Sequence, residues 1–103
     1  MKGQPYTLAF YRVKLGREEE FISRWRNVAM TFSSLTDPPI WGTLIRSTTS
    51  PNLFYSFGPW RDPSHVLAMR SDPSAQQAFA ELGSLCLEVT PGNYEAVEHV
   101  MMQ

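Results

Sequence analysis

The feature that most constrains this chain is an aromatic segment at residues 52–60, which predicts a strand running directly into a helix. Side chains alternate across a pleated strand. Its large apolar residues therefore divide between the two faces, with Leu53, Tyr55 and Phe57 on one and Phe54 and Trp60 on the other. An antiparallel sheet usually leaves one face to water, but neither face of this strand is polar. We therefore expect both faces of the predicted sheet to be covered.

The rest of the chain divides into alternating strand and helix patterns. An early strand is predicted at residues 6–15, and a long amphipathic helix with one apolar stripe at residues 18–35. A second strand at residues 40–47 pairs with the aromatic segment through a hairpin loop. Asp62-Pro63 and Asp72-Pro73 each place a capping aspartate before a proline, which predicts two consecutive helical segments.

The C-terminal part is predicted to contain two extended pieces separated by a turn. Residues 86–90 form the first piece, residues 91–93 the turn, and residues 94–101 the last strand.

This order predicts an α+β domain of the ferredoxin-like, split β-α-β type, with a four-stranded antiparallel sheet. Its length of 103 residues is that of a single domain, spanning residues 1–103. Both helical regions would cover one face of the sheet. A symmetric homodimer that closes sheet face against sheet face is the simplest cover for the other.

Charge and cysteine content exclude several classes of partner. The formal net charge is −1 with acids and bases interspersed, so neither nucleic acid nor an anionic membrane is an expected partner. The only cysteine, Cys86, cannot form an internal disulfide, which favours a reducing, cytoplasmic location. The chain shows no continuous apolar run typical of a signal peptide or a membrane span.

From about residue 6 to residue 100 the chain resembles the antibiotic biosynthesis monooxygenase family of the dimeric α+β barrel superfamily. The resemblance is carried by three segments: the run Gly16-Arg17-Glu18-Glu19-Glu20-Phe21 with Trp25, the run Leu44-Ile45-Arg46-Ser47, and the aromatic strand that ends in Trp60, followed by a final strand with Tyr94. It implies a homodimer forming an α+β barrel. Family members include oxygenases that oxidise polyketide-type or quinol precursors without a metal or prosthetic group, and enzymes that degrade haem.

Two departures from the family bear on cofactors. Where many relatives have a histidine in the helix after the tryptophan, this chain has Met69 or Arg70, and where the haem-degrading branch has an asparagine in the first strand it has Tyr11. A methionine on this helix is typical of core packing. Haem degradation is therefore disfavoured. His65 and His99 are far apart in sequence, no metal-ligand set is recognisable, and no cofactor is expected.

The candidate site is an aromatic and sulfur lining between helices and sheet, suited to a flat, hydrophobic aromatic molecule. Tyr11, Tyr55 and Trp60 are the catalytic candidates, as hydrogen-bond donors. The predicted substrate-binding residues are Trp25, Trp41, Phe57, Trp60, Met69 and Phe79, with Arg12, Arg46 and Arg70 as charged neighbours. For each residue the alternative role is simple core packing. No side chain stands out as a catalytic base.

Three functions remain open from the sequence. The first is a cofactor-independent monooxygenase acting on an aromatic, polyketide-like or quinol molecule. The second is a non-catalytic dimer that binds a hydrophobic small molecule or is associated with stress. The third is a cyclase or isomerase of polyketide-like substrates. The lack of an evident base favours the second.

Overall fold

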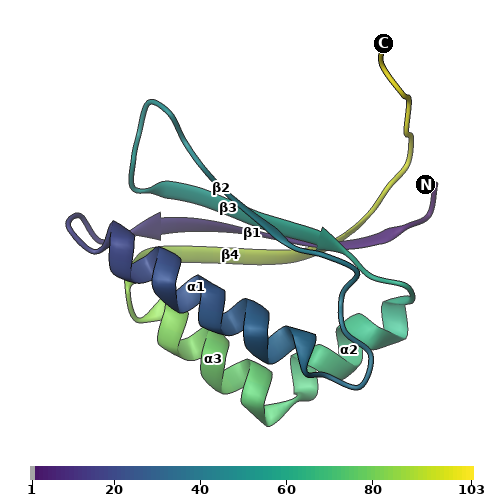
Figure 1. Cartoon of the computed structure of the whole chain (residues 1–103), viewed down its shortest axis with the longest axis horizontal. Coiled ribbons are helices and arrows are strands. Elements are labelled where there is room, and N and C mark those ends of the chain that lie inside the picture. The colour runs from purple at the N-terminus through teal and green to yellow at the C-terminus, as the bar shows by residue number, and fades with distance from the viewer. Residues whose placement is uncertain (1) are drawn as a thin grey trace.

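The computed structural model describes residues 2–103 as a four-stranded antiparallel sheet with three helices on one of its faces (Figure 1). The strands lie in the order β2-β3-β1-β4. Along the chain the elements are β1 (Pro5–Val13), α1 (Glu18–Ser33), β2 (Thr43–Arg46), β3 (Leu53–Pro59), α2 (Pro63–Ser71), α3 (Pro73–Gly83) and β4 (Cys86–Glu95). The predicted α+β class and its antiparallel sheet are confirmed.

The ends of α1 follow from local hydrogen bonding. Gly16 takes a positive φ of 88° that suits glycine, and its N–H donates to the carboxylate of Glu18 at 2.9 Å. At the other end, the hydroxyls of Ser33 and Ser34 donate to the carbonyl oxygen of Met30 at 2.7 and 3.2 Å. Such side-chain bonds compete with the helical pattern, so α1 ends at Ser33, short of the predicted residue 35.

The two capping aspartates act as predicted. The side chain of Asp62 accepts from the backbone N–H of Ser64 at 2.8 Å, and that of Asp72 from the N–H of Ala75 at 2.9 Å. The hydrogen bonds from Ser64 lower the pKa of the Asp62 carboxyl. Each aspartate is followed by a proline at the first helical position, so α2 and α3 are separate helices that meet at Asp72.

For the C-terminal part, the extended piece at residues 86–90 is confirmed, but the predicted turn at 91–93 and the last strand reaching residue 101 were wrong. β4 runs without interruption from Cys86 to Glu95, and residues 96–103 have no regular secondary structure. Pro91 is tolerated because β4 is an edge strand, paired only with β1. Gly92 makes room for the ring of Tyr94, which would lie 2.7 Å from any Cβ at that position. The Pro-Gly pair therefore lies within a strand and not in a turn.

The second strand is also shorter than predicted, since β2 begins at Thr43 and not at residue 40. The backbone before it crosses β3 closely, and a Cβ on Gly58 would overlap the carbonyl oxygen of Trp41. The N–H of Ile40 still donates to the carbonyl of Pro59 at 2.9 Å. Gly58 therefore allows residues 39–42 to lie against β3 without forming a regular ladder.

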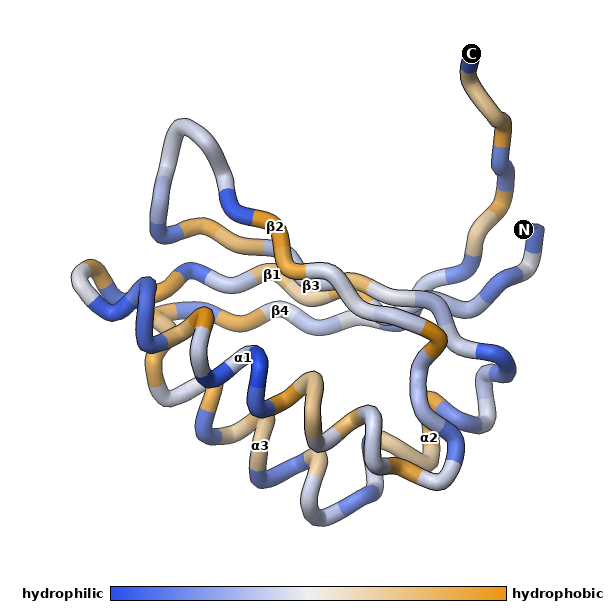
Figure 2. Tube along the Cα trace, viewed as in Figure 1, coloured by the Kyte–Doolittle hydropathy of each residue, from blue (hydrophilic) through white to orange (hydrophobic). Residues whose placement is uncertain are grey.

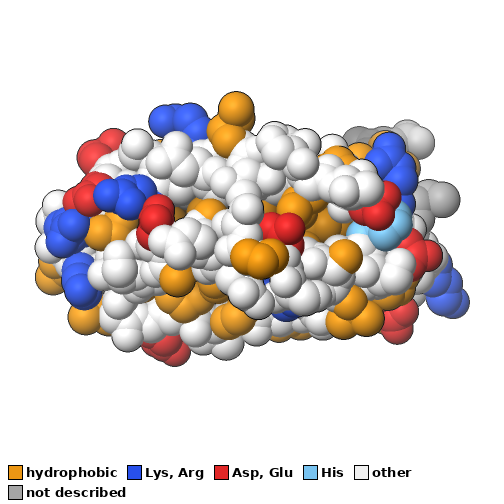
Figure 3. Space-filling model, turned by 90° about the horizontal axis from the view of Figure 1, so that it is seen from below, with side chains coloured by type: hydrophobic (Ala, Val, Ile, Leu, Met, Phe, Trp, Pro, Cys, Tyr) orange, Lys and Arg blue, Asp and Glu red, His pale blue; other side chains and the backbone are white. Residues whose placement is uncertain are grey.

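The main core fills the space between the sheet and the N-terminal half of α1. Its largest fully buried members are Tyr11, Val13, Phe21, Phe54 and Leu82. Phe21 packs against Tyr11 and Phe54, with ring centroids 5.0 and 4.8 Å away. The helix-side surface above this layer is mixed, with charged side chains gathered towards its two ends (Figure 3).

Within residues 2–103, no helix lies over the opposite face of the sheet (Figure 1). The strand registers place Leu8, Phe10, Ile45, Tyr55 and Phe57 on this face. Tyr55 is 45% exposed and Ile45 48% exposed. The expected second apolar face of the sheet is therefore present and uncovered in the single chain.

The C-terminal tail adds further exposed apolar surface. Val97, Val100 and Met101 are each more than half exposed. Figure 2 shows the hydrophobic segments of this tail extending away from the sheet and helices. Among the described residues, no helix has the length and apolar character needed to cross a membrane.

Candidate functional site

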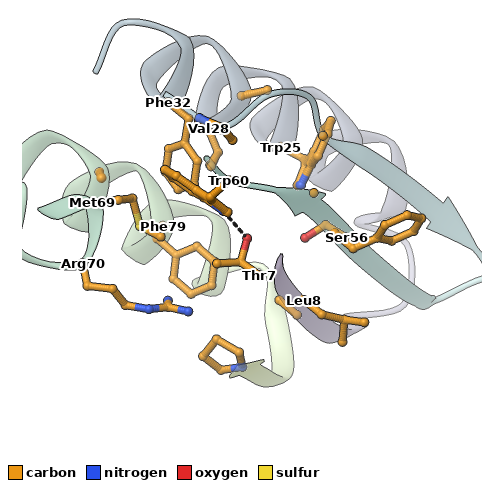
Figure 4. A pocket seen from close by; sticks show the side chains of 18 of the residues that line it. Thr7, Leu8, Trp25, Val28, Phe32, Ser56, Trp60, Met69, Arg70 and Phe79 are labelled. Atoms are coloured by element: carbon orange, nitrogen blue, oxygen red, sulfur yellow. Dashed lines mark hydrogen bonds between the residues drawn. The ribbon is translucent and has the colours of Figure 1, made fainter. Parts of the chain in front are cut away.

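A cavity of about 520 Å³ lies between the sheet and the C-terminal half of α1 (Figure 4). Strands β1 and β3 form one wall, α1 and α3 form another, and the end of α2 and residues 39–42 complete it. Most lining side chains are aliphatic or aromatic. The size and character are those of sites that hold small organic ligands.

The cavity exists because the helix-facing positions of the strands change from large to small side chains. On β1, Tyr11 and Val13 fill the core, whereas Ala9 and Thr7 follow towards the cavity. On β3, Phe54 is part of the core, whereas Ser56 and Gly58 line the cavity. The aromatic residues of the helices therefore surround a space above these small residues and do not fill it.

Two hydroxyl groups meet where the cavity joins the packed core. The phenol of Tyr11 and the hydroxyl of Ser56 are 2.8 Å apart, and either can be the donor. Burial raises the pKa of the Tyr11 phenol to about 12, although the hydrogen bond with Ser56 and the positive charge of Arg70 both act to lower it. Tyr11 therefore keeps its proton at neutral pH and offers a hydrogen bond, not a base.

Trp60 is held at the cavity wall by its ring and by its indole N–H. The side chain has no exposed surface, and its Nε1 donates to the hydroxyl of Thr7 at 3.0 Å (Figure 4). The Phe32 ring lies against it, with centroids 6.2 Å apart. Trp60 also belongs to a small buried cluster with Val66 and Met69. It is thus a structural wall whose donor is already engaged.

The structure brings together most of the residues that the sequence singled out. All six predicted substrate-binding residues border the cavity: Trp25, Trp41, Phe57, Trp60, Met69 and Phe79. The side chain of Phe57, however, lies on the uncovered face of the sheet, and the Trp41 ring packs against it with centroids 6.1 Å apart. Tyr11 and Trp60, two of the three catalytic candidates, line it as well. Their roles towards a ligand stay predictions.

Tyr55 is placed elsewhere. It lies on the uncovered face of the sheet, with its ring centroid 5.2 Å from that of Phe10. The sheet therefore separates Tyr55 from Tyr11 and Ser56. Of the predicted charged neighbours, Arg12 and Arg46 also lie outside the cavity, and Arg70 lies in its lining.

Sequence reasoning missed Ser56 and Thr7, the two hydroxyl partners in the cavity. The strand alternation carried a signal for them, because Thr7 shares a face with Tyr11, and Ser56 shares a face with Phe54 and Trp60. A small polar residue on an otherwise apolar, buried face marks a gap in packing or a hydrogen-bond partner. Here each is both.

Neither histidine contributes to the cavity lining. His65 lies in the first turn of α2, with its Nε2 3.7 Å from a carboxylate oxygen of Asp37. Its buried Nδ1 has no hydrogen-bond partner among the residues that the structure describes. His99 lies in the tail and not in a strand as predicted. Within residues 2–103, no cluster of three or more His, Cys, Asp or Glu side chains is arranged to hold a metal ion.

Comparison with known proteins shows likeness at the level of structure. No family model matches the sequence, and no curated protein has a significant sequence match. A variant of SnoaB, a cofactor-independent oxygenase from Streptomyces nogalater, superposes with a TM-score of 0.86 at 18% identity, covering 95% of this chain and 97% of that one.

Two further solved structures share the fold. One, an antibiotic biosynthesis monooxygenase, has a TM-score of 0.76 at 12% identity, covering 91% of this chain and 99% of that one. The other, from Methanosarcina mazei, has a TM-score of 0.79 at 14% identity, covering 90% and 92%. The resemblance drawn from the sequence is thus confirmed in the fold, over nearly the whole length of the chain.

Proposed function

We propose that this chain is a member of the antibiotic biosynthesis monooxygenase family that oxidises a flat aromatic, polyketide-like or quinol molecule without a cofactor. The observation that carries the proposal is the preformed apolar cavity with a Tyr11–Ser56 hydroxyl pair at its inner end. The likeness of fold to a cofactor-independent oxygenase supports it.

Such a reaction requires little from the protein. A substrate that loses a proton from an activated carbon becomes an anion that donates an electron to O₂. Oxidation of a methylene to a carbonyl then balances, with one oxygen atom in the product and the other in water. The protein supplies a water-poor cavity and hydrogen bonds to the developing anion.

The hydroxyl pair is the proposed source of those hydrogen bonds. Because Tyr11 stays protonated to high pH, it can donate to a substrate oxygen while Ser56 holds its orientation. Trp60 and Phe79 would bound the aromatic rings. Tyr55 has no role in this proposal, because it lies across the sheet.

A non-catalytic binding protein is the second candidate. It is favoured by one observation: among the cavity-lining residues that the structure describes, none is a carboxylate or a histidine, so no ordinary base is present. The oxygenase then depends on a substrate acidic enough to lose its proton to water. A binder needs no such substrate. A cyclase or isomerase would also need a proton-transfer group.

We further propose that the functional unit is a cytoplasmic homodimer and that residues 1–103 form a single domain in each copy. The uncovered face with Phe10 and Tyr55, together with the exposed apolar tail, provides surface for a second copy. Light scattering at micromolar concentration should give twice the 11.7 kDa chain mass. A stable monomer would count against this part of the proposal.

Oxygen consumption tests the proposed reaction. Purified protein is mixed with a panel of anthrones and hydroquinones, without added metal or flavin, and O₂ uptake is followed against the uncatalysed rate. Uptake that depends on the protein and falls in Tyr11→Phe supports the oxygenase. Tight binding with no uptake for any compound favours the second candidate. Absence of binding by every compound contradicts both.

A further inference from the structure

Arg70 is the only charged residue among the described residues that line the cavity. It lies in the last turn of α2 and is partly buried. Figure 4 shows its side chain extending beneath the Phe79 ring, on the side of the cavity away from Trp25. An otherwise apolar site thus carries one fixed positive charge at its edge.

The charge of Arg70 is not neutralised by a carboxylate within the described part of the chain. Four other arginines, Arg12, Arg17, Arg24 and Arg46, each lie within 4 Å of a glutamate. The Nη2 of Arg70 instead donates to the neutral amide oxygen of Asn93 at 2.7 Å. A guanidinium has five N–H donors in a planar fork, so most of its donor capacity remains for a ligand.

Arg70 is also tied at two points, one on its side chain and one on its backbone. Asn93 on β4 fixes the guanidinium, and the side-chain amide of Gln76 on α3 donates to the Arg70 carbonyl oxygen at 2.9 Å. A guanidinium that is already oriented loses little conformational freedom on binding. The arrangement therefore suits recognition of a planar anion.

The positive charge is felt inside the cavity as well as at its edge. It acts on the Tyr11 phenol, where it favours the ionised form and opposes the effect of burial on the pKa. Low-dielectric walls strengthen such interactions compared with water. An anion bound near Arg70 would therefore be stabilised by the same charge.

We propose that the cavity takes a flat aromatic ligand carrying an ionised carboxylate at its edge, and that Arg70 binds this carboxylate. The inference rests on the proposed function, because it assumes that the cavity is the ligand site. It adds that the ligand is an aromatic acid and that Arg70 selects for the acid group. The rings would then lie against Phe79 and Trp60, with the carboxylate towards Asn93.

The test compares anthraquinone-2-carboxylate with its methyl ester, which keeps the rings and removes the charge. Binding is measured through tryptophan fluorescence, to which Trp25 and Trp60 contribute from the cavity lining. In the unaltered protein the acid should bind about tenfold or more tightly than the ester, since hydrogen bonds to charged groups are the strong ones. Raising the salt concentration from about 0.05 to 0.5 M should weaken binding of the acid and leave binding of the ester unchanged.

Arg70→Gln should abolish the preference for the acid, and Arg70→Lys should retain part of it. Arg24→Gln is the matched control, because Arg24 lies outside the cavity and pairs with Glu20 and Glu81 on the surface. It should leave the preference intact. Thermal unfolding of each variant checks that the fold is kept.

The outcomes separate this inference from the proposed function. If the acid and ester bind equally, or if Arg70→Gln keeps the preference, the role of Arg70 is wrong and the aromatic cavity site stands. If neither compound binds, both the site and the inference are overturned. The salt and ester comparisons need no variant, so they decide the matter even if Arg70→Gln fails to fold.

Discussion

The two ends of the layer between sheet and helices are built from the same elements, yet one is filled and the other is hollow. At the filled end, Phe21 of α1 packs against Tyr11 and Phe54. At the hollow end, Thr7 and Ser56 occupy the corresponding strand faces, and a cavity of about 520 Å³ remains. The strands, more than the helices, therefore decide where this fold has space for a ligand.

The largest expected effect comes from truncating one phenylalanine at each end. Phe21→Ala removes a side chain with no exposed surface and should lower the free energy of unfolding by about 3–5 kcal/mol. Phe79→Ala removes a partly buried ring beside existing empty space and should cost about 1–2 kcal/mol. Urea denaturation of the two variants measures both values. Equal losses would mean that the cavity is filled in solution.

The boundary between the two ends can be tested through the ionisation of Tyr11. Its folded pKa of about 12 lies above the usual value of 10.0, so the folded state holds this proton more tightly. The resulting contribution to the free energy of unfolding, about 2–3 kcal/mol, is complete below pH 10. It is lost as the pH rises from 10 through 12. Tyr11→Phe should remove this decline in the unfolding free energy.

The ionisation of Cys86 must be distinguished from that of Tyr11, because burial raises the pKa of the Cys86 thiol to about 11. Its contribution is lost from about pH 9 upward, in an overlapping window. We therefore expect the cleanest comparison between Cys86→Ala and the double variant Cys86→Ala/Tyr11→Phe. An equally steep alkaline decline in both would contradict the burial of Tyr11.

Added volume should have opposite consequences at the two ends. Ala78 packs against the filled core, so Ala78→Leu should overpack it and cost about 1–3 kcal/mol. Ala29 lines the cavity, so Ala29→Leu should leave stability nearly unchanged and weaken binding of an aromatic ligand. Thermal unfolding and a binding titration on both variants make the comparison. Greater destabilisation by Ala29→Leu would count against the hollow end.

The smallest expected effect concerns the wall of the cavity. Trp60→Phe keeps an apolar ring in place and removes the hydrogen bond from Nε1 to Thr7, at a cost of about 1 kcal/mol beyond the lost ring area. Thr7→Val removes the acceptor instead, and combining the two should cost less than their sum. Full additivity in urea denaturation would show that the bond contributes nothing.

Much of this arrangement follows from sequence pattern, and the exceptions have identifiable causes. The two-faced segment around Phe54 and the capping aspartates predicted β3, α2 and α3, because alternation and capping are local rules. The Pro91-Gly92 pair predicted a turn, since nothing local shows that β4 is an edge strand. The alternation of side chains along the strand also predicts that Tyr55 and Trp60 lie on opposite faces of the sheet. The structure places them there.

The cavity itself was predicted only as an aromatic lining. Whether aromatic rings fill a core or surround a space depends on the residues opposite them, and these lie on other strands. Ser56 and Thr7 carry that information, but their meaning depends on the register between β1 and β3. Residues distant in sequence decide the packing, so the local pattern of Trp25 or Phe79 does not reveal the space.

The most direct test of the hollow end is a titration of the protein with anthraquinone followed by two-dimensional ¹H–¹⁵N NMR. The indole N–H groups of Trp25 and Trp60 and the backbone amides of Thr7 and Ser56 are the reporters. We predict saturable shifts at these groups and none at Phe21 or Val13 in the filled end. Absence of saturable shifts, or shifts confined to the uncovered sheet face around Tyr55, would contradict a ligand cavity at this end of the layer.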